Sequence, residues 1–346
     1  MSKARTVAHV AAGLAAAGYL ARQALRRARR WDLRRRVVVI TGGSRGLGLV
    51  LAREMARHGA RLVILARDAG EIERACCDLS ARGAEVVGIA CDVRSESQVG
   101  CAVEKIIAEF GRIDVLVNNA GVIQVGPIEN MTKADIEDAL NTHLWGPVHT
   151  MFAVLPHMRR QRQGRIVNIS SIGGKVAIPH LVPYSASKFA LVGLSDGMHT
   201  ELVRSGIRVT TVCPGLMRTG SPINATMKGR HEEEFTWFAI SDSLPLATIS
   251  AESAARSIVK ACRYGDAHVV LSLPAKAVAL CAGVFPNLTI EALSVIDRLL
   301  PPPAAAGGDE PRRGLDSQTR WAPSMLTRLS DKAAKRNNEL PRNGRH

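Results

Sequence analysis

Apolar positions in the middle of the chain alternate between two spacings. Short continuous runs of mostly β-branched residues predict strands, and between them apolar residues recur every three or four positions, which predicts helices. The predicted strands span residues 37–41, 61–66, 86–91, 113–117, 165–170, 209–212 and 268–271. Because these runs are continuous rather than alternating, we expect both faces of the sheet to be buried.

The helices predicted between these strands span residues 47–58, 72–81, 99–110, 134–158, 185–203 and 252–263. Pro147 and Pro156 lie inside the longest of them, so a kink or break is expected there. Strands that alternate with helices through short turns predict a Rossmann-type α/β fold, a doubly wound parallel sheet of seven strands in a single domain with basic tails.

The 346 residues, 46% of them hydrophobic and 22% charged, allow one large globular domain. We expect a basic, partly apolar extension over 1–35, the α/β domain over 36–272 and an apolar helical segment over 273–300. The sequence PPPAAAGG at 301–308 and the polar, basic residues after it predict a disordered tail over 301–346.

The net charge of +15 lies in the two tails, because residues 37–300 carry only +2. A basic tail can bind anionic lipid, bind nucleic acid or remain solvated. Aromatic residues make up only 4% of the chain, which leaves little surface for base stacking and argues against nucleic acid.

Residues 6–21 carry no charged side chain, and five arginines follow them at positions 22–30. The stretch is shorter than the roughly 20 apolar residues of a spanning helix. It can be a weak membrane anchor, a basic surface helix or an inert extension. If it inserts, the arginines place the main domain in the cytoplasm, so we expect a cytoplasmic protein attached to a membrane through these residues.

The seven cysteines are odd in number and include no C-x-x-C pair. This pattern is typical of reduced thiols in a reducing compartment, and it predicts neither a disulfide framework nor a metal site.

A glycine-rich turn, Thr41-Gly-Gly-Ser-Arg-Gly-Leu-Gly48, joins the first predicted strand to the first helix. Such a turn lets backbone N–H groups approach a pyrophosphate at the N-terminus of the helix. Its glycine spacing, G-x-x-x-G-x-G, differs from the G-x-G-x-x-G of the dinucleotide fingerprint.

The end of the second strand bears on which dinucleotide binds. NAD-selective folds place an acid there for the ribose 2′-hydroxyl, whereas this chain has Arg67, with Asp68 one position later. Arg67 and Arg45 can flank a 2′-phosphate, because arginine offers planar, bidentate donors. We therefore expect NADP(H) to be preferred over NAD(H).

Tyr184 and Lys188 lie four residues apart, on one face of a predicted helix. Together with the turn at 41–48 and the Asn118-Asn-Ala-Gly121 segment after the fourth strand, they make the chain resemble the classical short-chain dehydrogenase/reductase family over residues 36–272.

The resemblance implies a role for each motif position. The implied catalytic tetrad is Asn141, Ser171, Tyr184 and Lys188. The implied cofactor-binding residues are Thr41, Gly42, Ser44, Arg45, Gly46, Leu47, Gly48, Arg67, Asp92, Val93, Asn119, Ala120, Gly121, Tyr184, Lys188, Pro214, Gly215 and Thr219. Asp92 would contact the adenine, and Asn141 would hold a water beside Lys188.

The chemistry explains these residue types. Hydride transfer to a ketone builds negative charge on its oxygen, which a serine hydroxyl can stabilise and a tyrosine can protonate. A nearby lysine ammonium would lower the pKa of Tyr184 toward neutrality. His180 lies between Ser171 and Tyr184, where it can contact substrate or serve only the loop.

We therefore expect an NADP(H)-dependent oxidoreductase that interconverts a ketone or aldehyde and an alcohol on an apolar substrate. The family implies a homo-oligomer. The alternatives are a non-catalytic NADP(H)-sensing or scaffold protein of the same fold, and a nucleic-acid binder that uses its basic tails.

Overall fold

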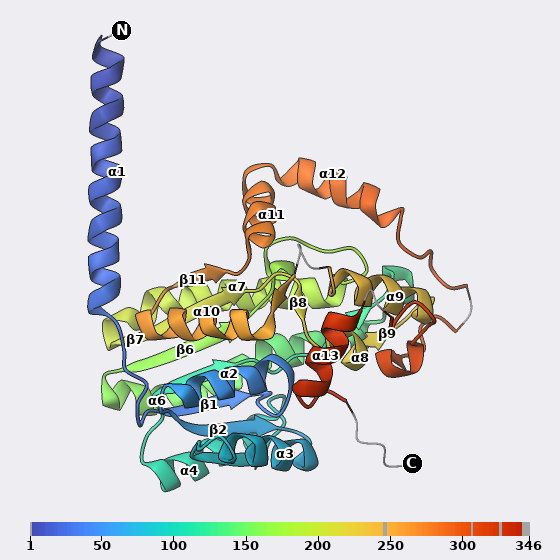
Figure 1. Ribbon diagram of the computed structural model, residues 1–346, viewed down its shortest axis with the longest axis horizontal. Coiled ribbons are helices and arrows are strands. Elements are labelled where there is room, and N and C mark those ends of the chain that lie inside the picture. The colour runs from blue at the N-terminus through green and yellow to red at the C-terminus, as the bar shows by residue number, and fades with distance from the viewer. Residues whose placement is uncertain (1, 245–247, 306, 325–326, 341–346) are drawn as a thin grey trace.

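A parallel sheet of seven strands lies at the centre of the described part of the chain, in the order β11-β7-β6-β4-β1-β2-β3 (Figure 1). The computed structural model describes residues 2–244, 248–305, 307–324 and 327–340. The strands of this sheet are β1 (Val37–Thr41), β2 (Arg61–Ala66), β3 (Val86–Ala90), β4 (Val115–Asn118), β6 (Gly164–Ile169), β7 (Ile207–Cys213) and β11 (His268–Val270). The predicted doubly wound Rossmann-type fold is confirmed.

The central strand β1 shows why the sheet forms. All five of its residues are buried, and it pairs in parallel with β2 and β4, so that Thr41 lies beside Leu65 and Asn118. Residues buried on both faces of a strand need a helical layer on each side. The helices on one face are α2 (Gly46–Arg57), α3 (Ala69–Ser80) and α10 (Ala251–Tyr264), and those on the other are α4 (Glu96–Phe110), α6 (Gly146–Gln161) and α7 (Val182–Leu202).

The helix predicted over 134–158 contains a wider turn. Helix α5 (Lys133–Leu140) is followed by a π-helical turn, η2 (Asn141–Trp145), and then by α6. The backbone stays helical through this turn, so the helix widens locally and does not break. The π-helical turn lies directly before Pro147, which has no N–H to continue the regular hydrogen-bond pattern. Pro156 lies inside α6 without ending it.

Smaller elements surround the edge of the sheet where the strands end. Two short sheets, β10-β8 and β12-β9-β5, lie there. Their strands are β5 (Gln124–Val125), β8 (Met217–Arg218), β9 (Thr226–Met227), β10 (Ile249–Ser250) and β12 (Arg312–Arg313), and the helices beside them are α8 (Ser221–Asn224) and α9 (His231–Ser241).

The N-terminal extension forms helix α1 (Ser2–Ala28), which projects from the body (Figure 1). Arg26 at its base donates two hydrogen bonds to Asp266. Trp31 then lies between the guanidinium groups of Arg36 and Arg165. None of the described helices is long and apolar enough to span a membrane.

The C-terminal tail is not disordered over its described part, contrary to the expectation for 301–346. Strand β12 pairs with β9, and η5 (Gly314–Ser317) and α13 (Arg328–Arg336) follow. Its Ala322, Ser317 and Asn337 are fully buried. Composition could not reveal this order, because the tail is held largely by polar contacts with the body, such as the Gly314 N–H donating to the Ala225 carbonyl.

Candidate active site

A cavity of about 470 Å³ lies at the carboxyl ends of the central strands. Its walls come from the residues that follow β1, β2, β3, β4, β6 and β7. In an open α/β sheet, ligands bind at this edge, in the crevice outside the strand ends. The cavity joins the glycine-rich turn at one end to Tyr184 and Lys188 at the other.

The turn between β1 and α2 is built on close backbone contacts. Gly42 has a φ of +61°, and a Cβ there would lie 2.9 Å from the Ala120 Cα. A Cβ on Gly48 would overlap the Gly42 carbonyl oxygen. These two positions therefore require glycine. The Thr41 hydroxyl accepts hydrogen bonds from the N–H groups of Asn119 and Ala120, which attaches the turn to the end of β4.

The turn fits a dinucleotide pyrophosphate. Gly46 and Leu47 line the cavity at the first residues of α2, where N–H groups without a partner inside the helix, together with the helix dipole, favour an anion. Thr41 and Gly48 do not line the cavity themselves but shape the turn from behind.

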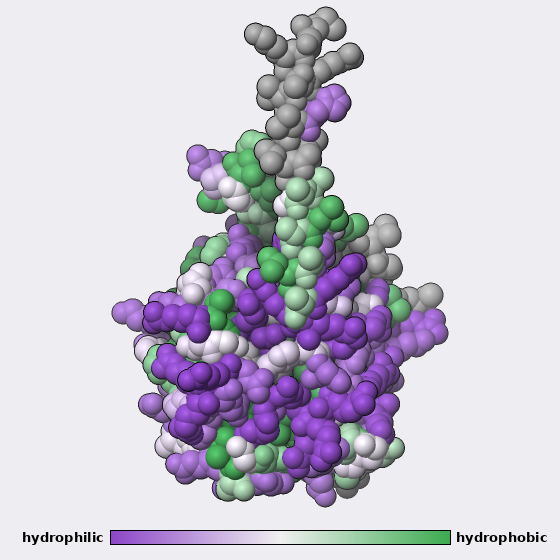
Figure 2. All heavy atoms as spheres, turned by 90° about the vertical axis from the view of Figure 1, so that its left-hand side faces the viewer, coloured by the Kyte–Doolittle hydropathy of each residue, from purple (hydrophilic) through white to green (hydrophobic). Residues whose placement is uncertain are grey.

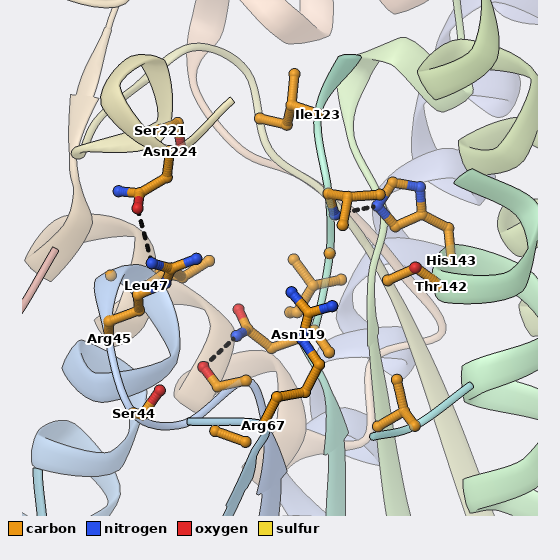
Figure 3. A pocket seen from close by; sticks show the side chains of 18 of the residues that line it. Ser44, Arg45, Leu47, Arg67, Asn119, Ile123, Thr142, His143, Ser221 and Asn224 are labelled. Carbon is orange, nitrogen blue, oxygen red and sulfur yellow. Dashed lines mark hydrogen bonds between the residues drawn. The ribbon is translucent and has the colours of Figure 1, made fainter. Parts of the chain in front are cut away.

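The two arginines expected near a 2′-phosphate differ in their surroundings. Arg45 donates hydrogen bonds to Glu71 and Asn224, so its guanidinium is already engaged (Figure 3). Arg67 reaches into the cavity near Asn119 and forms no ion pair among the described residues (Figure 3). Asp68 caps α3 by accepting from the Glu71 N–H.

The expected adenine end of the cavity contains Asp92 and Val93. The Arg94 guanidinium bonds to the Asp92 carboxylate and lowers its pKa. Because Arg94 also pairs with Asp138, this cluster joins the end of β3 to α5.

Ser171, Tyr184 and Lys188 come together at the other end of the cavity. Ser171 follows β6, and its hydroxyl accepts from the Gly173 N–H at 3.0 Å. Tyr184 and Lys188 lie in the first turns of α7. The Lys188 ammonium donates to the Ile169 carbonyl at 3.0 Å and lies 5.5 Å from the centre of the Tyr184 ring.

Burial dominates the protonation of this pair. It raises the pKa of Tyr184 to about 12, although a hydrogen bond with Ser171 opposes the shift. It lowers the pKa of Lys188 to about 7. The expected lowering of the Tyr184 pKa by Lys188 is therefore not what this structure shows, because desolvation outweighs the attraction of a lysine that burial itself tends to neutralise.

The structure does not bring Asn141 to the site. Its side chain is exposed at the start of the π-helical turn and does not line the cavity. His143, two residues on, is buried in the cavity wall with its ring edge-on to Tyr184, 5.4 Å between centres. The wide turn changes the direction in which successive side chains point, and a regular helical period cannot predict this.

His143 links three segments around the site. Its Nε2 accepts from the Val122 N–H, the bond dashed at His143 in Figure 3. Its Nδ1 therefore carries the proton and donates to the Ser187 hydroxyl at 2.8 Å. The Ser187 hydroxyl in turn donates to the Tyr184 carbonyl. Burial lowers the pKa of His143 well below its ordinary value, which keeps the ring neutral.

Of the remaining residues predicted to bind the cofactor, most line the cavity and one does not. Ala120, Gly121, Pro214 and Gly215 line the cavity, whereas Thr219 is buried beside it and bonds to Ser221. Further lining residues that sequence patterns did not single out are Ile123, Thr142, Met217, Ser221, Asn224 and Glu339. No group of three metal-ligating side chains occurs in the ranges that the structure describes.

His180 lies outside the cavity wall. It is buried with a φ of +60°, and its Nδ1 bonds to the Glu234 carboxylate of α9 at 2.8 Å. Its Nε2 faces Asp297 at 3.6 Å. His180 therefore links α9 to the helix that ends at Asp297, and it does not line the cavity in which a substrate would bind.

A glycine turn at the sheet edge, with a serine, a tyrosine and a lysine at the nicotinamide end of the same cavity, defines a dinucleotide-dependent oxidoreductase of the Rossmann type. The short chain dehydrogenase family pattern matches residues 36–228. The chain belongs to this family.

Curated relatives and solved structures support the same family assignment. The chain is 34% identical to the ketoacyl reductase HetN of Nostoc sp., over 68% of this chain and 78% of that protein. It is 33% identical to the granaticin polyketide synthase putative ketoacyl reductase 1 of Streptomyces violaceoruber, over 72% and 92%. A gluconate 5-dehydrogenase from Burkholderia cenocepacia, solved with NADP and tartrate, matches with a TM-score of 0.63 and 26% identity, over 72% and 98%. The protein is an NAD(P)-dependent short-chain dehydrogenase/reductase.

The depressed pKa of Lys188 predicts how stability depends on pH without added nucleotide. Lys188 titrates at about 7 in the folded protein, against an ordinary value of 10.5 in the unfolded chain. Between these values the unfolded chain binds more protons, so this group makes the free energy of unfolding rise with pH. The rise should be smaller in Lys188→Met, measured by urea denaturation across this range. The exposed Lys260 supplies a control, Lys260→Met, and equal slopes in all three proteins would contradict the burial of Lys188.

Proposed function

We propose that this enzyme prefers NADP(H) to NAD(H) and interconverts a ketone or aldehyde with an alcohol on an apolar substrate, with Tyr184 as the general acid and base. The observation that carries the proposal is that Ser171, Tyr184 and Lys188 line the same cavity as the glycine turn. The similarity to proteins named ketoacyl reductases supports a carbonyl substrate.

In this mechanism, the nicotinamide supplies or accepts the hydride when it is bound. In reduction, the Tyr184 hydroxyl donates its proton to the carbonyl oxygen, and in oxidation it takes the proton back. A tyrosine whose pKa lies at about 12 is held as the phenol, which is the form that reduction requires. The Ser171 hydroxyl donates a hydrogen bond to the same oxygen and stabilises its developing charge.

Lys188 acts on Tyr184 through its charge. When protonated, its ammonium favours the phenolate that remains after proton transfer. The water-holding role that the family resemblance implied for Asn141 has no support in the geometry, since that side chain is exposed. No step of the proposed mechanism uses Asn141.

The substrate end of the cavity supports an apolar substrate. Ile123 and Met217 line the cavity, and Ile123 packs in the same apolar cluster as Tyr184. The apolar side chains of α9 contribute less directly, because Phe235 and Phe238 are buried in a cluster with Leu181. Apolar walls favour a substrate with a hydrocarbon body next to its carbonyl group.

The preference for NADP(H) rests on Arg67. A charge-assisted hydrogen bond contributes about 1.5–3 kcal/mol, so Arg67→Ala should raise the Kd for NADPH by about tenfold to a hundredfold. The Kd for NADH should stay unchanged, because that cofactor has no 2′-phosphate. Fluorescence titration measures both, with the exposed Arg82→Ala as the control. An equal loss for the two cofactors would show that Arg67 does not recognise the 2′-phosphate.

Replacement of Tyr184 tests the chemistry. Tyr184→Phe should retain NADPH binding and lower kcat by about 10²–10⁴-fold on a panel of apolar ketones, because the proton donor is lost. The rival function, an NADP(H) sensor of the same fold, predicts that the variant keeps the cellular function of the wild type. Full turnover in Tyr184→Phe would contradict the proposed mechanism.

A further inference from the structure

The two helices that follow the sheet expose an unusual amount of apolar surface. We call residues 273–299, which comprise α11 (Leu273–Val284), Phe285, α12 (Pro286–Asp297) and the two residues after it, the apolar hairpin. Between residues 273 and 290 it carries one charged side chain, Lys276. Of the twenty-two exposed large hydrophobic side chains among the described residues, ten belong to it: Leu273, Val278, Leu280, Val284, Phe285, Leu288, Ile290, Val295, Ile296 and Leu299. A soluble surface rarely leaves so many apolar side chains in one place without a partner.

Helix α1 and the apolar hairpin both project from the upper side of the body in Figure 1. Tyr19, Leu20 and Leu25 are exposed on it. Residues 22–30 contain five arginines and no acid, and among the described residues only Arg26 of the five is in an ion pair. The body below is mainly hydrophilic on the face shown in Figure 2.

We propose that the apolar hairpin and α1 form one surface that docks on a bilayer with anionic lipid headgroups. Exposed Leu, Ile, Val and Phe side chains next to an arginine cluster suit the boundary between acyl chains and headgroups. A second copy of the chain would bring a second arginine cluster of the same charge, whereas anionic headgroups carry the opposite charge.

The hairpin also lies beside the route to the catalytic serine. Ala275, Ala279 and Leu293 pack on Ile172 and Val176, in the segment directly after Ser171. Asp297, at the end of α12, faces His180. A bilayer that holds the hairpin therefore lies next to the segment that follows Ser171. The proposed apolar carbonyl substrate belongs to a class of compounds that dissolves in lipid. This last step rests on the proposed function, whereas docking does not.

Flotation with vesicles tests docking without any assay of turnover. The wild-type protein should float with vesicles of phosphatidylcholine and phosphatidylglycerol and much less with phosphatidylcholine alone. The double variant Leu280→Glu, Phe285→Glu should bind the mixed vesicles at least about tenfold more weakly, because two apolar side chains no longer enter the bilayer. Both positions are exposed, so the fold should be kept, and Ile128→Glu, at another exposed apolar side chain, is the control.

Two results would overturn this proposal. One is a double variant that floats as the wild type does. The other is a double variant that loses self-association in light scattering while its vesicle binding is unchanged, which would make a second copy the partner. Equal binding to both vesicle types would overturn the proposal as well, because the proposal requires anionic headgroups. None of these results bears on Tyr184 or the cofactor.

A separate observation concerns the end of the C-terminal tail. Residues 336–339, the C-terminal strap, lie across the glycine turn. The Gly46 N–H donates to the Asn337 carbonyl at 2.9 Å, and the Asn338 side chain donates to the Ser44 carbonyl. Arg53 and Arg74 hold the two asparagine side chains from α2 and α3.

Glu339 carries the strap into the cavity. Its carboxylate accepts from the Gly220 N–H at 2.8 Å, and a Cβ on Gly46 would lie 2.8 Å from its Oε1. It is buried, and burial raises its pKa to about 7. The carboxylate and the Asn337 carbonyl therefore fill the anion-binding end of the turn.

We infer that the C-terminal strap and the cofactor pyrophosphate compete for this end of the cavity, so that the docked strap inhibits the enzyme. Two anionic groups in one buried site repel each other strongly. The strap must leave before the pyrophosphate reaches the N–H of Gly46. This inference rests on cofactor binding at the glycine turn.

Full-length Glu339→Gln keeps the shape of the side chain and removes its charge. It should bind NADPH roughly tenfold more tightly than the wild type. Glu310→Gln, an exposed acid of the same tail, is the control and should bind as the wild type does. In wild-type protein, hydrogen exchange of residues 336–340 should become faster when NADPH is added.

An unchanged or weaker NADPH affinity in Glu339→Gln would overturn the competition, as would slower exchange of the strap with NADPH, because the strap would then be part of the cofactor site. If none of the three proteins binds NADPH or NADH, the cofactor assignment fails, and the inhibitory role of the strap fails with it.

Discussion

The close approach of the β1–α2 turn to the end of β4 is the constraint on which the site depends. Gly42 and Gly48 leave no room for a side chain, and Thr41 joins the turn to Asn119 and Ala120. Because the turn lies so close to the ends of β1 and β4, its backbone N–H groups gather at one place. A phosphate can bind to these N–H groups without a charged side chain. The parallel strands then bring the ends of β6 and β7 to the same edge, which places Ser171 and Pro214 across the cavity.

Burial controls the protonation of Tyr184 and Lys188 at the end of the cavity away from the glycine turn. The same desolvation that raises the pKa of Tyr184 lowers that of Lys188, so both groups favour their neutral forms in the closed cavity. A neutral phenol can donate a proton to a carbonyl, and a lysine near its titration point can change its charge during a catalytic cycle. The neutral His143 closes the wall behind them through hydrogen bonds to Val122 and Ser187.

Much of the fold could be predicted from the sequence, because continuous apolar runs such as 37–41 can be buried only between two layers. The glycine turn, Tyr184 and Lys188 could be predicted because their chemistry depends on local spacing. Asn141 could not be separated from His143 in this way, since a π-helical turn rotates the side chains after residue 140. The order of the C-terminal tail depends on contacts such as that of Glu339 with Gly220, between residues far apart in sequence and polar in composition.

A crystal structure of the complex with NADP would show whether one cavity holds the dinucleotide with its reactive ring at the tyrosine. We expect the pyrophosphate at the N–H groups of Gly46 and Leu47, the nicotinamide next to Tyr184 and Lys188, and Glu339 displaced from Gly220. A cofactor bound elsewhere, or bound in the cavity with its nicotinamide away from Tyr184, would refute this arrangement.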